Sequence, residues 1–356
     1  MIGTQTDRRP VTNRNRIIVR MVSAHGRFSI LLLCALAALI AIAVATPGHD
    51  RAKAATRPAS VVERVVPPST PIDPPRPLQS LWLTDLYARF PSMTSLLAPR
   101  FSILPDHQIV SYYGNPYSGL MGVLGASDLE SMADALERQA ARYDALNGPL
   151  DVIPAIHLVY AVAQPHPTDN GLYLQYVDDA AVLRYFALAE ERDMLLFLDL
   201  QIGRSTVADE VRKVLPFLRN PRVHLALDPE FAVDSKYAPG DVIGSLNAEE
   251  IDAAQALLQD LVIAERLPPK LLMVHQFLDE MVIGGDSINY YEGVDLIIDM
   301  DGFGPAAVKR ATYEEYAGRT YAAHAAIKLF FEHDTDLMSE QDVLFLNPMP
   351  AVVIYQ

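Results

Sequence analysis

The amino-acid sequence predicts an α/β protein whose main domain is a (β/α)8 TIM-type barrel. After residue 78 the chain contains eight short apolar runs, helical patterns separate them, and several runs end in acidic or amide side chains. Apolar runs without alternation are typical of parallel strands covered on both faces, and eight strand–helix units need roughly 250 residues. An open, doubly wound parallel sheet is the alternative that this pattern allows.

The N-terminal residues 1–27 form a basic segment that we expect in the cytoplasm, since six arginines stand there against one acid. Residues 28–46 are predicted to form a membrane helix, because they contain an uncharged run of 18 residues, just long enough to span a bilayer. The arginines predict a single pass that leaves the C-terminal domain outside the cell membrane. Secretion after cleavage of a signal peptide near Ala45 is the alternative, because Ala43-Val44-Ala45 fits a cleavage site.

Residues 47–78 contain eight prolines in 32 positions, which predicts a semi-rigid linker at most roughly 100 Å long. Residues 79–356 then form one predicted barrel domain. The only cysteine, Cys34, lies in the apolar run, so the domain has neither a disulfide nor a cysteine-based metal site.

The charge of the chain is unevenly distributed between the leader and the domain. Residues 1–78 hold 11 basic and 4 acidic residues of the 29 and 44 in the chain, which leaves 18 basic and 40 acidic residues for 79–356. A domain of this charge should repel nucleic acid and anionic surfaces. The membrane partner is therefore expected to be reached only through residues 28–46.

The predicted strands follow the apolar runs in chain order: 109–113, 152–162, 194–200, 223–227, 271–274, 296–300, 327–331 and 351–355. The predicted helices between them are 127–147, 178–192, 205–218, 247–265 and 305–323. No helical pattern follows the last strand, so we expect a barrel that lacks its eighth helix. Short helices within 81–97 are expected to cover the gap between the last strand and the first.

Polar side chains gather where the predicted strands end, and barrel enzymes place their chemistry at those ends. Charged residues seldom interrupt a buried strand without a partner or a task. The candidate substrate-binding residues at these ends are Tyr112, Tyr113, Tyr160, Asp199, Gln201, His275, Gln276, Asp299, Asp301 and Lys328. Of these, Lys328 could instead be a structural partner for a strand-end acid. His157 is expected to be a hydrogen-bonded core histidine.

The strongest strand end is Leu227-Asp228-Pro229-Glu230. Asp228 and Glu230 are two residues apart, so on a strand both carboxylates would point to the same side. Pro229 cannot donate to a sheet, so pairing should stop near it. Two carboxylates beside a scissile bond can act as acid and as base or nucleophile in glycoside hydrolysis. We therefore expect Glu230 as the acid/base, with Asp228 or Glu332 as its catalytic partner.

This strand end resembles the Asp-x-Glu strand end of (β/α)8-barrel glycoside hydrolases of the chitinase and lysozyme types. The placement of Glu230 and Glu332 on strands four and seven is also similar to that of the large retaining-glycosidase clan. The longer acidic run of the chitinase signature and the Asn-Glu pair of the clan are absent. The general layout resembles that of bacterial exported or membrane-anchored proteins. The resemblance implies a carbohydrate ligand and hydrolysis without a cofactor.

Three functions fit these residues. The first is a membrane-tethered, extracytoplasmic carbohydrate hydrolase. The second is a non-catalytic barrel that binds glycan or serves as a scaffold. The third is a metal-dependent hydrolase, for which the hard oxygen ligands and one imidazole would come from Asp199, Asp228, Glu230, His275, Asp299 and Asp301. No His-x-His or His-Glu-x-x-His pair is present, so the primary expectation includes no metal.

Overall fold

The computed structural model describes residues 102–356. The basic segment, the predicted membrane helix, the linker and the predicted helices within 81–97 lie outside the described residues. Within 102–356, no helix is long and apolar enough to cross a membrane.

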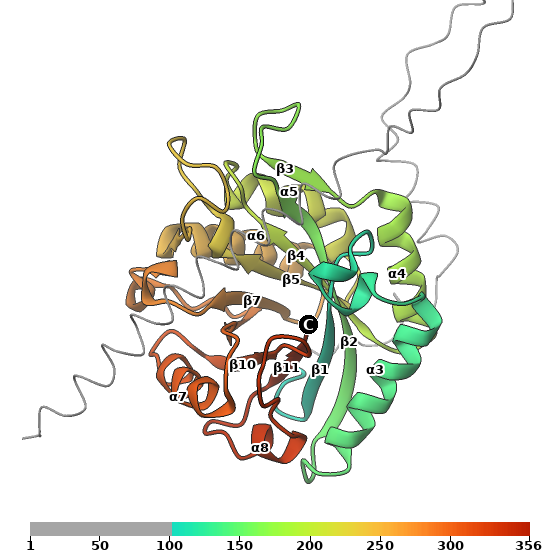
Figure 1. Ribbon diagram of the computed structural model, residues 1–356. Helices are drawn as coiled ribbons and strands as arrows, with labels where there is room; N and C mark the ends of the chain where they lie inside the picture. Colours follow the sequence, from blue (N-terminus) through green and yellow to red (C-terminus); the bar gives the residue numbers. More distant parts are fainter. Residues whose placement is uncertain (1–101) are drawn as a thin grey trace, which may run out of the picture.

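Eight parallel strands close into a barrel (Figure 1). Each strand pairs with the next, and β1 pairs with both β2 and β11, which closes the sheet. The predicted (β/α)8 barrel is therefore confirmed, and the open sheet is excluded. The barrel strands are β1 (His107–Gly114), β2 (Asp151–Ala163), β4 (Leu195–Gln201), β5 (Val223–Asp228), β7 (Lys270–Gln276), β9 (Val294–Met300), β10 (His324–Leu329) and β11 (Val352–Tyr355).

Helices surround the barrel, as Figure 1 shows in a view close to the barrel axis. They are α3 (Leu129–Asp144), α4 (Asp179–Glu191), α5 (Val207–Leu218), α6 (Ala248–Glu265), α7 (Ala306–Ala317) and the short α8 (Glu340–Leu344). The first five match the predicted helices, and α8 between β10 and β11 was not predicted. Side-chain caps set several helix starts, for example Asp128 before α3 and the capping box of Asn247 and Glu250 before α6.

The remaining short elements lie in the connections between strands and helices. The strand β3 (Leu174–Tyr176) pairs antiparallel with the end of β2, and β6 (Leu246–Asn247) pairs with β8 (Val282–Ile283). Single 3-10 turns are η2 (Gly119–Met121), η3 (Val123–Gly125), η4 (Pro229–Phe231), η5 (Asp279–Met281) and η6 (Gly285–Ser287). Of these, η4 directly follows β5 and holds Glu230.

The strand side chains divide into two sets that alternate along each strand. One set packs against the helices and forms the larger hydrophobic core. The other set fills the barrel with apolar side chains such as Ile109, Phe197, Met273 and Ile354. Burying both faces explains why the strands are continuous apolar runs in the sequence.

Toward the carboxyl ends of the strands, the inward-facing positions become polar. The residues two positions beyond inward apolar side chains are His157 on β2, Asp199 on β4, Asp228 on β5, His275 on β7, Asp299 on β9 and Lys328 on β10. All six side chains are buried. The fold therefore replaces the upper part of the apolar filling by a polar cluster contributed by six strands.

Candidate active site at the carboxyl ends of the strands

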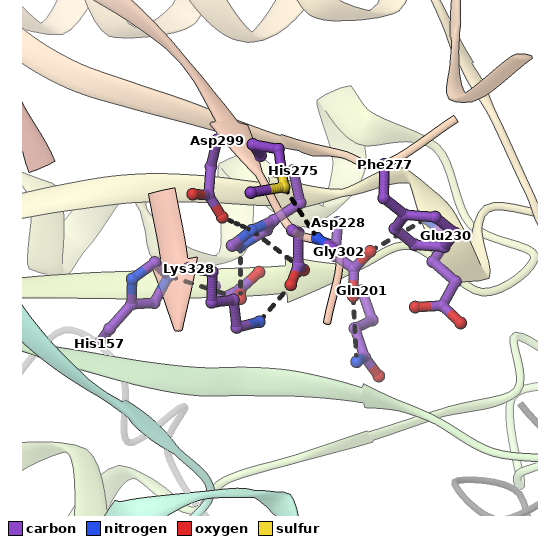
Figure 2. A network of polar contacts seen from close by, with 12 residues as sticks. His157, Gln201, Asp228, Glu230, His275, Phe277, Asp299, Gly302 and Lys328 are labelled. Carbon is purple, nitrogen blue, oxygen red and sulfur yellow. Dashed lines mark hydrogen bonds and ion pairs between the residues drawn. The ribbon is translucent and has the colours of Figure 1, made fainter. Parts of the chain in front are cut away.

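The centre of the polar cluster is His275, which lies between carboxylates on two sides (Figure 2). Its Nε2 donates to Asp199 Oδ2 at 3.1 Å, and its Nδ1 donates to Asp299 Oδ2 at 2.8 Å. The Oδ2 of Asp301 lies 3.4 Å from the same Nδ1. Because β7 and β9 pair with His275 opposite Asp299, the register of the sheet itself sets this contact.

Asp199 extends the cluster from β4 toward β2. Its Oδ2 lies 3.5 Å from the Nε2 of His157, and both side chains are fully buried. The ring of His157 stacks on Phe197 with centroids 5.2 Å apart, and the Tyr113 ring lies tilted against the same imidazole with centroids 4.9 Å apart. The imidazole is thus fixed by aromatic packing, although neither of its nitrogens makes a hydrogen bond to a described residue.

On the other side of His275, Lys328 compensates the charge of Asp301. Its Nζ lies 3.1 Å from Asp301 Oδ2 and 3.6 Å from the centroid of the Tyr113 ring. The contact with Asp301 therefore makes Lys328 a structural partner for a strand-end acid, which is the alternative expected for this residue. The cation–π contact with Tyr113 further fixes the ammonium group.

Asp228 ends β5 and is held by two donors. Gln201 Nε2 donates to its Oδ2 at 3.3 Å, and the backbone N–H of Glu230 donates to its Oδ1 at 2.9 Å. The strand ends at Asp228 and Pro229 begins the turn η4, as the proline predicted. The expectation that Asp228 and Glu230 share one strand face is wrong, because Glu230 belongs to the turn. Figure 2 shows Glu230 beside Phe277, at the edge of the cluster.

The cluster shifts the ionisation of its members in opposite directions. Burial alone would lower the pKa of His275, but the charge of Asp199 and the hydrogen bonds to Asp199 and Asp299 raise it well above its ordinary value. Burial would likewise lower the pKa of Lys328, and the carboxylates, led by Asp301, raise it. Both groups are therefore cations within the barrel.

The acids of the cluster divide into two kinds. Burial would raise the pKa of Asp199, but the charge of His275 and the contacts with both histidines hold it below its ordinary range. Burial raises the pKa of Asp228 to about 6, and the negative charges of Asp199 and Asp301 add to the shift. Burial also raises the pKa of Asp301, against the opposing charge of Lys328. Asp228 and Asp301 are therefore harder to ionise than ordinary carboxyls, and Asp228 can hold its proton up to about pH 6.

A second buried ion pair supports the cluster from outside. Lys309 of α7 lies 3.2 Å from Asp334, and its Nζ also donates to the backbone carbonyl of Lys328 at 2.6 Å. Asp334 in turn accepts from the backbone N–H groups of Gly304 and Phe330. These contacts connect the segments that follow β9 and β10, which position Asp301 and Lys328.

Three predicted substrate-binding residues lie outside the barrel interior. Tyr112 and Tyr160 belong to the core between strands and helices, where the hydroxyl of Tyr112 faces the carbonyl oxygen of Ala135. Gln276 follows His275 and points to the other side of β7, where the hydroxyl of Tyr321 donates to it at 3.0 Å. We correct these predicted sugar contacts, because strand alternation turns the side chains away from the cluster.

Glu332 is also placed differently from the expectation. Strand β10 ends at Leu329, and Glu332 is exposed in the turn that follows. The expected placement of Glu332 on the seventh strand is therefore wrong, and we no longer expect it to be the catalytic partner of Glu230. The buried acid of this segment is Asp334, which pairs with Lys309.

The cluster also contains a residue that the site prediction left out. His157 was expected to be a hydrogen-bonded core histidine, whereas its nitrogens are without a hydrogen bond among the described residues. The sequence signal that could have identified His157 is the alternation of side chains along the strand, since Ala155 and Val159, two positions to either side, also point into the barrel. Within residues 102–356, two groups of side chains could hold a metal ion, and both include His275: His157 with Asp199, and Asp299 with Asp301.

The fold and the cluster define a (β/α)8 barrel with a polar centre at the carboxyl ends of its strands. No protein-family model matches the sequence, and no curated protein matches it. The chain is similar in structure to a GH18 chitinase from Pseudoalteromonas aurantia, with 10% identity over 70% of this chain and 93% of that chain and a TM-score of 0.35.

Two mannanases of Bacillus subtilis are similar at the same level. For mannanase man26 the identity is 8%, the coverage 78% and 85%, and the TM-score 0.37. For mannanase BCman the values are 9%, 71% and 82%, and 0.34. A chitinase and two mannanases are thus among the solved structures that this chain resembles, in agreement with the expected weak resemblance to glycoside hydrolases. The barrel assignment itself rests on the strand order.

Proposed function

We propose that this protein is a membrane-tethered, extracytoplasmic hydrolase that acts on carbohydrate. The observation that carries the proposal is Asp228, a carboxyl 4% exposed at the end of a barrel strand, whose pKa is raised to about 6. A carboxyl that keeps its proton up to about pH 6 can donate it to the leaving oxygen of a glycosidic bond.

The second carboxylate comes from the neighbourhood of Asp228. Glu230 lies two residues further along the chain and is more exposed, and Asp301 directly follows β9 with Lys328 beside it. After Asp228 protonates the leaving group, either residue can attack the anomeric carbon or activate water. The roles of Asp228 and Glu230 are thus exchanged relative to the sequence-based assignment, because Asp228 is the more buried of the two.

The polar residues around Asp228 are suited to hold sugar hydroxyls. Gln201 binds Asp228 through its amide nitrogen and accepts from the backbone of Ala163 at 2.8 Å, so its orientation is fixed. Lys328 and Asp301 offer a donor and an acceptor on the opposite strands. Fixed polar groups of this kind are what orient a ligand in a barrel mouth.

The experiment that tests the hydrolase proposal measures released reducing ends from a panel of soluble polysaccharides. Asp228→Asn should abolish turnover while ligand binding persists, since Asn keeps the shape but cannot donate the proton. Glu332→Gln is the matched control and should keep full activity, because Glu332 is exposed in a turn. Equal activity of Asp228→Asn and the parent would refute the role of Asp228.

The membrane location is a separate part of the proposal. It rests on the 18-residue apolar run and the arginines before it. Protease added to intact spheroplasts should remove the barrel domain if residues 47–356 lie outside. A domain that stays protected until the membrane is dissolved would contradict the topology, and a domain found free in the medium would favour signal-peptide cleavage.

A non-catalytic, glycan-binding barrel is the second candidate. The pairing of Asp299 with His275 and of Asp301 with Lys328 supports it, because paired charges can be structural. Binding of a polysaccharide without any product after long incubation, unchanged in Asp228→Asn, would favour this candidate over the hydrolase.

A further inference from the structure

We infer that His157, Asp199 and His275 form a binding site for one divalent transition-metal ion. The inference goes beyond the proposed hydrolase and does not depend on it. It assigns the ligand atoms to two imidazoles and one carboxylate from β2, β4 and β7, whereas the acid roles above belong to Asp228, Glu230 and Asp301. Three ligand atoms at coordination spacing and a buried imidazole without a hydrogen bond support this site.

The spacing of the three ligand atoms fits direct coordination. Asp199 Oδ2 lies 3.1 Å from His275 Nε2 and 3.5 Å from His157 Nε2, and all three atoms lie within 4.8 Å of one another. Ligands at about 2.0–2.1 Å from a tetrahedral Zn²⁺ ion are about 3.3 Å apart. The oxygen therefore already lies at coordination spacing from both nitrogens, and metal binding would release the proton that His275 Nε2 donates to Asp199 Oδ2.

His157 gives the independent observation that this group expects a ligand. Its side chain is fully buried, and neither nitrogen makes a hydrogen bond to the described residues, with Asp199 Oδ2 at 3.5 Å as the near polar atom of Nε2. A buried imidazole without a partner is costly. Stacking against Phe197 fixes the ring with Nε2 near Asp199, where a metal ion would satisfy that nitrogen.

Asp299 supplies the support that metal-binding histidines usually have. Its Oδ2 accepts from Nδ1 of His275 at 2.8 Å, which leaves Nε2 of the same ring directed at Asp199. A carboxylate on the far nitrogen of a ligating histidine fixes the tautomer and the ring orientation. Asp299 is therefore a positioning residue and not a ligand.

The second geometrically possible group, His275 with Asp299 and Asp301, is a weaker metal site. Lys328 Nζ lies 3.1 Å from Asp301 Oδ2, so an ammonium group already neutralises this carboxylate. The two imidazoles and one carboxylate of His157, His275 and Asp199 suit Zn²⁺, Fe²⁺ or Co²⁺ rather than Mg²⁺ or Ca²⁺, which prefer oxygen ligands.

The test uses the full chain, stripped with a chelator and then given Zn²⁺ or Co²⁺. After removal of free metal, elemental analysis should find one ion per chain, and Co²⁺ should give the visible absorption of a low-coordinate site. His157→Gln and Asp199→Asn should each retain less than about a tenth of the metal. Asp299→Asn should weaken binding by about 10–100-fold, as loss of an outer carboxylate does.

Two matched controls separate this site from its neighbours. His224→Gln removes another imidazole from the barrel interior, one that is 2% exposed and bonded to the backbone N–H of Leu271. It should leave the metal content unchanged. Asp301→Asn should also leave it unchanged, whereas the alternative group predicts its loss.

A wild-type crystal soaked in Zn²⁺ gives a readout that needs no folded variant. The anomalous peak should lie between His157 Nε2 and His275 Nε2. The inference is overturned if the folded wild-type chain retains no stoichiometric ion, if the peak lies between His275 and Asp301, or if His157→Gln and His224→Gln bind metal equally.

Discussion

Replacing Asp228 by asparagine should stabilise the protein at neutral pH. The folded state holds the pKa of Asp228 at about 6 against 3.8 for the free side chain, so the folded protein binds this proton more tightly than the unfolded chain does. The stabilising contribution of the protonated carboxyl is therefore full below about pH 4 and is lost as the pH rises from there through about 6. Asparagine carries no charge at any pH and avoids this loss.

The magnitude follows from the shift and the local hydrogen bonds. Raising the pKa of Asp228 from 3.8 to about 6 corresponds to roughly 3 kcal/mol at pH 7. The asparagine oxygen can still accept the hydrogen bond from the backbone N–H of Glu230. The donor Gln201 Nε2 would face an amide nitrogen instead of Asp228 Oδ2, which costs about 1 kcal/mol. The net gain is about 2 kcal/mol, or roughly 4–8 °C in the melting temperature.

Calorimetric melting of both proteins from pH 4 to pH 8 measures this difference. Asp228→Asn should gain on the parent across pH 4 to 6 and keep a constant advantage above it. Glu332→Gln, an exposed carboxylate in a turn, should follow the parent at every pH. A variant that melts below the parent by the same amount at pH 4 and pH 8 would refute the assignment of a proton to Asp228.

Two further predictions concern buried lysines. Lys309→Met should lower the free energy of unfolding by about 3–5 kcal/mol in denaturant titrations, because Asp334 remains buried without its cation. Lys236→Met, at an exposed side chain, is the control and should change the free energy of unfolding by less than about 0.5 kcal/mol. Equal effects of the two substitutions would contradict the pairing of Lys309 with Asp334. Burial lowers the pKa of Lys270 to about 7, so the unfolded chain binds more protons than the folded protein between pH 7 and the ordinary lysine pKa. The free energy of unfolding should therefore rise with pH over that interval. Lys270→Met should flatten this rise, and an unchanged slope would refute the lowered pKa of Lys270.

The sequence predicted the barrel well because burial on both faces leaves a strong pattern. Each of the eight apolar runs falls on a barrel strand, since a parallel strand between helices and a filled interior has no exposed face. The helices were found from their caps and lengths. The exception is α8, whose five residues are too few for a periodic pattern, although Ser339 and Asp342 form a capping box.

The site was predicted only in part, because neighbouring polar residues at a strand end were all expected to face the same site. Tyr112 and Tyr113 are neighbours in sequence, yet Tyr113 packs against Lys328 inside the barrel and Tyr112 packs between strand and helix. Once one inward-facing apolar residue is identified on a strand, the alternation of side chains shows which of the two tyrosines faces the barrel interior. The exact end of a strand is harder to predict, and for this reason Glu230 and Glu332 were both assigned to strands that stop before them.

The incomplete pairing of the cluster argues for a task beyond stability. Charges in a barrel interior are costly unless every polar atom has a partner, and His275 satisfies both of its nitrogens. Oδ1 of Asp199, Oδ1 of Asp299 and both nitrogens of His157 nevertheless lack a hydrogen bond among the described residues. A cluster that served only to hold the strands together could use apolar side chains at these positions, as the lower barrel does. The unsatisfied atoms point inward at the carboxyl ends of the strands, where a bound ion or ligand would complete them.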